Sequence, residues 1–135
     1  MIGSLIISLA TWAATASPEA AIALVTWAAG RADLAAELVR ICRAESAGCR
    51  AIGVHGTRHN PPGRAFYAAG VAYGLVRPAE CPDSHGPHTA DAWGPRGAFG
   101  LAGYRAVALH PCAPPQVLDV PIVSAAIALA HLVEL

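Results

Sequence analysis

The segment that most constrains the fold of this chain is residues 33–45, where apolar side chains recur every three or four positions. This spacing predicts an α-helix, because residues three and four apart lie on one face of a helix. The apolar face consists of Leu34, Leu38, Ile41 and Cys42. Glu45 falls on the same face and ends the pattern. We therefore expect a helix that packs against a core and carries one carboxylate at the edge of that core.

The position of Glu45 suggests a role in proton transfer. Partial burial and the negative end of the helix dipole both favour the neutral form of its carboxyl group. A general acid that works near neutral pH needs this form. The alternative is a structural carboxylate paired with an arginine, and Arg43 and Arg50 are close enough in sequence to pair with it.

The remaining sequence predicts one mainly α domain with a long irregular central loop. The chain has 135 residues, is 55% hydrophobic and is rich in alanine, which favours helices. Ser17 and Pro18 are typical of a helix start, whereas Pro61-Pro62-Gly63 is expected to break the chain and residues 81–96 to be irregular. We expect helices over residues 2–14, 18–29, 33–45, 64–75, 101–109 and 121–133.

Residues 1–16 form an apolar segment that we separate from the main domain, residues 17–135. Ala14-Thr15-Ala16 is similar to a signal-peptidase site, but no Arg or Lys precedes the apolar run. The run is also shorter than the roughly 20 residues that span a bilayer. We interpret it as a helix packed on the domain. An export signal, or a segment that associates with a membrane or a virion, is the alternative.

The four cysteines predict two disulfides in this small, loop-containing domain. Four cysteines allow three pairings. Cys42 and Cys49 are close enough to pair locally, and Cys81 and Cys112 would then tie the central loop to the segment before the last helix. Disulfides indicate an extracytoplasmic place of work, whereas four reduced thiols would fit a cytosolic domain.

Glu45-Ser46, followed later by Gly97-Ala98-Phe99-Gly100-Leu101, resembles the signature of the soluble lytic transglycosylases, relatives of goose-type lysozyme. Residues 118–126 resemble a later helix of that family, so the resemblance covers roughly residues 33–132. The family usually continues its glycine motif with Met-Gln, whereas this chain has Ala102-Gly103.

The resemblance implies a lysozyme-like fold of several helices around a substrate cleft, and cleavage of peptidoglycan strands. Glu45 would act as acid and then as base while the 6-hydroxyl of the sugar closes an anhydro ring. A hydrolytic route would instead need a second carboxylate, for which Asp83 and Asp91 are the candidates. The expected substrate-binding residues are Ser46, His55, Gly97, Ala98, Gly100, Leu101 and Tyr104, with Tyr104 or Arg105 replacing the missing Met-Gln contact.

Other classes of function receive little support from the sequence. The net charge is zero and the arginines are scattered, so we expect no nucleic-acid partner. Cys81, His85 and His88 are spaced so that one loop could present them together, but the chain has no Cys-x-x-Cys pair, and His55 and His59 do not lie in a helix-like segment. No phosphate or dinucleotide loop is present either, so we expect neither metal nor cofactor. The expected setting is a secreted or periplasmic enzyme, a phage lysin or a virion-associated enzyme. An inactive lysozyme-like module that binds glycan or serves in a phage particle is the alternative, followed by a small membrane-associated partner protein.

Overall fold

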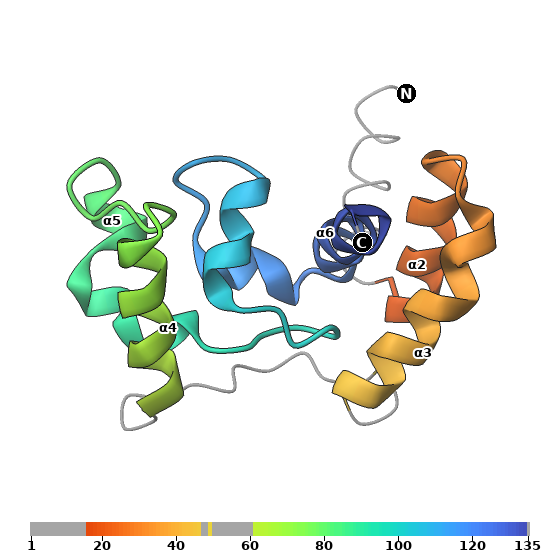
Figure 1. Ribbon diagram of the computed structural model, residues 1–135, viewed down its shortest axis with the longest axis horizontal. Helices are drawn as coiled ribbons and strands as arrows, with labels where there is room; N and C mark the ends of the chain where they lie inside the picture. Colours follow the sequence, from red (N-terminus) through yellow and green to blue (C-terminus); the bar gives the residue numbers. More distant parts are fainter. Residues whose placement is uncertain (1–15, 47–48, 50–60, 135) are drawn as a thin grey trace, which may run out of the picture.

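The computed structural model describes residues 16–46, 49 and 61–134 (Figure 1). Within these ranges the chain is mainly helical, as expected, and its one β-bridge is an antiparallel pair between Arg96 and Leu101. The expected helix over residues 2–14 and the candidate residues Arg50, His55 and His59 lie outside the described ranges. Across those ranges, no helix combines the length and apolar character that crossing a membrane requires.

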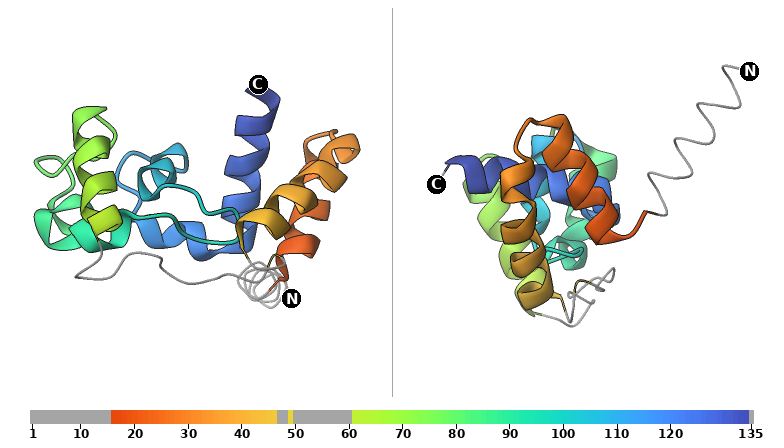
Figure 2. Two further views of the ribbon diagram at one scale, coloured as in Figure 1. Left: turned by 60° about the horizontal axis from the view of Figure 1, so that its bottom comes forward. Right: turned by 90° about the vertical axis from the view of Figure 1, so that its right-hand side faces the viewer.

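The helices gather at two ends of the molecule (Figures 1 and 2). One end contains α2 (Pro18–Ala28), η1 (Ala32–Leu34), α3 (Ala35–Glu45) and α6 (Pro121–Glu134). The other end contains α4 (Pro61–Ala72), α5 (Pro82–His85) and η2 (Pro87–Trp93). The 3-10 helices η3 (Gly103–Ala108) and η4 (Pro115–Asp119) lie between the two ends. The chain crosses from η2 toward α3 and back before it enters η3.

The α2–α3–α6 end follows the sequence signals closely. Ser17 caps α2 by accepting a hydrogen bond on its Oγ from the Ala20 amide at 3.2 Å, and Gly30 follows the helix with a φ of +68°. These are ordinary start and stop devices of a helix. The buried residues that join the three helices include Ala21, Ile22, Leu38, Cys42, Ala125 and Leu129. Cys42 pairs with Cys49 in a disulfide just beyond the end of α3.

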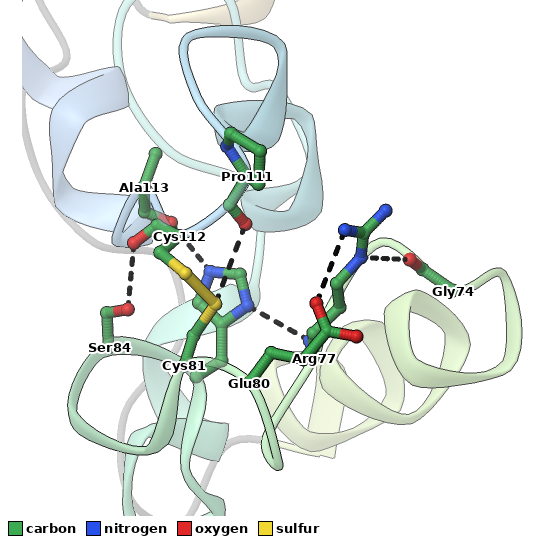
Figure 3. The surroundings of a disulfide bond; sticks show 9 residues. Gly74, Arg77, Glu80, Cys81, Ser84, Pro111, Cys112 and Ala113 are labelled. Atoms are coloured by element: carbon green, nitrogen blue, oxygen red, sulfur yellow. Dashed lines mark hydrogen bonds and ion pairs between the residues drawn. A yellow bond between two sulfur atoms is a disulfide. The ribbon is translucent and has the colours of Figure 1, made fainter.

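The other end is built around the buried side chains of His85 and Trp93, whose rings meet edge to face at 4.9 Å. His85 Nδ1 accepts the Arg77 amide at 3.0 Å, so Nε2 carries the proton and donates to the Ala113 carbonyl at 2.9 Å (Figure 3). The His85 amide donates to the Cys81 carbonyl at 2.8 Å, so the second disulfide, Cys81–Cys112, lies beside this histidine. Both disulfides match the pairing that the sequence suggested, the local pair Cys42–Cys49 and the distant pair Cys81–Cys112, and they fit an extracytoplasmic location.

Two expectations about the central region were wrong. Pro61-Pro62-Gly63 begins α4 instead of breaking the chain, because proline suits the first turn of a helix, where its missing N–H costs nothing. Gly63 also has to lack a side chain, since a Cβ there would lie 2.5 Å from the Asp91 carbonyl oxygen.

Residues 81–96, which we expected to be irregular, contain α5 and η2. Their polar side chains bond inward: the Trp93 indole N–H donates to Thr89 Oγ1 at 2.8 Å, and the Thr89 hydroxyl donates to the Gly86 carbonyl at 2.7 Å. Polarity therefore did not mean a loose loop here, because these groups satisfy one another inside the fold.

Candidate functional site

The two motifs singled out in the sequence meet at the end of α3. Arg96 and Leu101 exchange backbone hydrogen bonds of 2.9 and 3.1 Å and close a tight turn, in which Gly97 and Gly100 have φ values of +69° and +59°. This turn reaches the C-terminal end of α3 (Figure 1). A Cβ on Gly100 would lie 3.3 Å from Glu45 Oε2. The expected close approach of the glycine turn to the glutamate is therefore present at Gly100.

Gly97 serves a different contact from the one we expected. A Cβ at this position would overlap the carbonyl oxygen of Leu118, so Gly97 allows the turn to lie against η4 and not against Glu45. Ala98 and Phe99 are buried in the core that joins α2, α3 and α6. The turn is thus held on both sides, and Gly100 has a defined position next to the carboxylate.

A buried ion pair holds the base of the turn. Arg96 is only 2% exposed, and its guanidinium donates to Asp119 at 3.2 Å (Nε to Oδ1) and 2.6 Å (Nη2 to Oδ2). Arg96 Nη1 also donates to the Ala92 carbonyl at 3.0 Å. Sequence reasoning missed this pair. The one sequence signal for it was the position of Arg96, directly before a glycine-rich apolar turn. Its partner, Asp119, is far away in the sequence.

Glu45 is the last residue of α3, and its side chain is exposed. The expected partial burial was wrong, because Ser46 and not Glu45 turns inward at the helix end. Ser46 is buried, and its hydroxyl donates to the Cys42 carbonyl at 3.0 Å. Ser46 therefore ends the helix and is not placed to bind substrate. The Glu45 carboxylate forms no ion pair with any other residue in the described ranges, Arg43 included.

Two other acidic residues of this end, Asp33 and Glu37, are paired with arginines. Hydrogen bonds from Arg31 hold the pKa of the Asp33 carboxyl below its ordinary value, and those from Arg40 do the same for Glu37. These pairs lie on the exposed surface, so they contribute little to stability. Glu45 therefore differs from Asp33 and Glu37, which form ion pairs with arginines at the same end of the molecule.

Two hollows adjoin α6, and the smaller of them also adjoins the turn. The smaller, of 150 Å³, lies between Ile41, which is one helical turn before Glu45, and the turn residues Phe99 and Leu101. The larger, of 300 Å³, lies between η3 and α6 and is lined in part by Tyr104. His131 of α6 lines both hollows.

Several predicted site residues lie elsewhere. Tyr104 packs toward α4, with its ring centre 6.2 Å from that of Phe66, and does not approach the turn beside Glu45. Asp83 and Asp91 lie on α5 and η2, at the opposite end of the molecule from α3 (Figure 1). Asp91 is also 3.1 Å from Arg64 Nε. The structure therefore does not bring either carboxylate to Glu45.

The described residues contain no cluster of three or more histidine, cysteine or acidic side chains suited to a metal ion. Cys81 is in a disulfide and both ring nitrogens of His85 are hydrogen-bonded, which removes two of the three residues considered for zinc. Comparisons with protein-family models, curated proteins and solved structures found no match to this chain.

Proposed function

We propose that this protein is a muramidase of the lytic transglycosylase type, which cleaves the bond between N-acetylmuramic acid and N-acetylglucosamine in peptidoglycan. The observation that supports the proposal is the meeting of Glu45 with the Gly97–Gly100 turn. The two elements are far apart in sequence, yet a Cβ on Gly100 would touch the Glu45 carboxylate. An exposed carboxylate next to a glycine leaves room for a sugar at the acid.

In the proposed mechanism, Glu45 first donates its proton to the glycosidic oxygen as the bond from that oxygen to the sugar C1 breaks. The N-acetyl group of the substrate stabilises the positive charge that develops at C1. The 6-hydroxyl oxygen of the sugar then bonds to C1 while the Glu45 carboxylate takes the hydroxyl proton. This step closes the anhydro ring and restores the acid. The route needs one carboxylate, and this agrees with Asp83 and Asp91 lying at the other end of the molecule.

The exposure of Glu45 sets a requirement on this mechanism. Glu45 is exposed, so in this mechanism a bound strand has to cover it and exclude water before the acid can work. The smaller hollow, beside Ile41 and Phe99, supplies apolar walls for such a strand. The two disulfides suit an enzyme that works outside the cytoplasm, either secreted or carried by a virion.

The test is mass spectrometry of the soluble products after purified peptidoglycan is incubated with the wild type and with Glu45→Gln. Glu37→Gln is the matched control, because Glu37 is an acid on the same helix that pairs with Arg40. We expect anhydromuropeptides from the wild type and the control, and none from Glu45→Gln. Products with reducing ends would indicate hydrolysis and overturn the one-glutamate route.

A non-catalytic lysozyme-like module is the second candidate. Its specific support is that Ser46 is buried and that Ala102-Gly103 stands where the resembling family has Met-Gln, so fewer side chains than expected face a substrate at Glu45. Binding to peptidoglycan by a folded wild type that releases no soluble product would favour this function over the enzyme.

A further inference from the structure

The larger hollow, between η3 and α6, has a composition that suits a charged sugar. It has a volume of 300 Å³, and its polar lining comes from Tyr104 and Arg105 on η3 and from His131 and Glu134 on α6. The rest of the lining is apolar. Pockets that combine apolar walls with a few polar groups of fixed position are typical of sites for small ligands.

Arg105 is the arginine that lines this hollow. Arg31, Arg40, Arg64, Arg77 and Arg96 each pair with a carboxylate. Arg105 is exposed and forms no ion pair with any residue of the described ranges, including Glu134, which also lines the hollow. Its guanidinium carbon lies 5.4 Å from the centre of the Tyr104 ring. Stacking of this kind holds the cation in place and leaves its N–H groups available to a carboxylate.

Tyr104 belongs to a group of aromatic side chains at the surface. Its ring centre is 5.8 Å from that of Tyr73, which is 66% exposed, and 6.2 Å from that of Phe66. These three rings also line a separate hollow of 200 Å³ on the other side of Tyr104. Aromatic rings that present an apolar surface beside polar groups are suited to amphipathic ligands, and a sugar ring is one.

We propose that this hollow binds a carboxylate-bearing amino sugar of the peptidoglycan strand, with the sugar ring against Tyr104 and the carboxylate on Arg105. The proposal rests on the proposed function, because it takes peptidoglycan as the ligand. His131 lines both this hollow and the one beside Ile41, so the two hollows are neighbours along α6. Arg105 and Tyr104 thus select which sugar of the strand occupies this hollow.

The test uses Glu45→Gln, so that no turnover occurs, and two monosaccharides as probes. N-acetylmuramic acid and N-acetylglucosamine differ only in the lactyl ether that carries the carboxylate. Both are titrated by NMR into Glu45→Gln, and then into the same protein with Arg105→Gln or, as the matched control, with Arg40→Gln. Arg40 is an exposed arginine on the outer side of α3 that pairs with Glu37.

We expect N-acetylmuramic acid to bind about two- to fivefold more tightly than N-acetylglucosamine, the range for one solvent-exposed ion pair. Arg105→Gln should abolish this preference, Arg40→Gln should retain it, and Tyr104→Leu should weaken both sugars. Because Arg105 is exposed, its substitution should leave the circular dichroism spectrum unchanged.

Equal affinity for the two sugars, a preference that survives Arg105→Gln, or no binding of either sugar would overturn the assignment. If the wild type releases anhydromuropeptides and one of these results is also found, the proposed function holds but this binding site does not. Conversely, an Arg105-dependent preference in a protein that releases no product would support the site and favour the non-catalytic module.

Discussion

Replacement of Gly97 by alanine should destabilise the turn that faces Glu45 much more than a typical glycine substitution. Gly97 has a φ of +69°, and a Cβ there would overlap the Leu118 carbonyl oxygen. That oxygen belongs to the backbone of η4, next to the Arg96–Asp119 pair, so it cannot rotate away as a side chain would.

The magnitude has two parts. The left-handed conformation costs an L-residue about 1–2 kcal/mol. Forcing a methyl group into a packed site costs about 1–3 kcal/mol more. We therefore expect Gly97→Ala to lower the free energy of unfolding by about 2–5 kcal/mol, out of the roughly 5–15 kcal/mol typical of a domain.

Gly74→Ala is the matched control, because Gly74 has nearly the same φ, +72°, and a Cβ there would have no heavy atom within 4 Å. It should lose only the conformational part, about 1–2 kcal/mol. The assay is urea unfolding followed by circular dichroism, with both disulfides intact. If Gly97→Ala lost no more stability than Gly74→Ala, the packing of the turn against η4 would be refuted.

Four further perturbations test the framework of the fold. Arg96→Met should cost about 3–5 kcal/mol in urea unfolding, because it leaves the partly buried Asp119 without its partner; a loss below 1 kcal/mol would mean that water screens the pair. Loop entropy predicts that removal of the Cys81–Cys112 disulfide, which joins residues 31 apart, costs about 3.7 kcal/mol. Removal of Cys42–Cys49, 7 apart, should cost about 2.4 kcal/mol, and paired Cys→Ala variants test this order. Burial raises the pKa of the Tyr67 phenol, so above about pH 10 the unfolded chain loses its proton first and stability falls as pH rises. Tyr67→Phe should reduce this loss of stability at alkaline pH. An unchanged dependence of the free energy of unfolding on pH would contradict the role of Tyr67.

Much of the α2–α3–α6 end follows from local sequence. The cap at Ser17, the stop at Gly30 and the apolar spacing of residues 33–45 each depend on residues within one or two turns, so they predict α2 and α3 correctly. The start of α6 at Pro121 follows from the same rule. The Cys42–Cys49 disulfide also follows from proximity along the chain, and with four cysteines it leaves Cys81 and Cys112 as the other pair.

The central region could not be predicted in this way. Residues 81–96 are rich in proline, glycine, histidine and aspartate, which locally indicate a loop. Their short helices depend instead on distant partners, such as the Ala113 carbonyl that accepts from His85 and the Cys112 carbonyl that accepts from Ser84 at 2.8 Å. No window of local sequence contains both members of such a pair.

The candidate site divides along the same line. The sequence by itself determined that a helix ends at Glu45 and that a glycine turn follows much later, because helical spacing and glycine content are local properties. Only the tertiary structure decided that the turn lies against Glu45 at Gly100, that Ser46 and not Glu45 is buried, and that Asp83 and Asp91 lie elsewhere. The physical reason is that burial at a helix end depends on what packs against it. Here the element that packs against the helix end is the Gly97–Gly100 turn. The ion pair between Arg96 and Asp119 holds this turn in place, and these two residues are 23 apart in the chain.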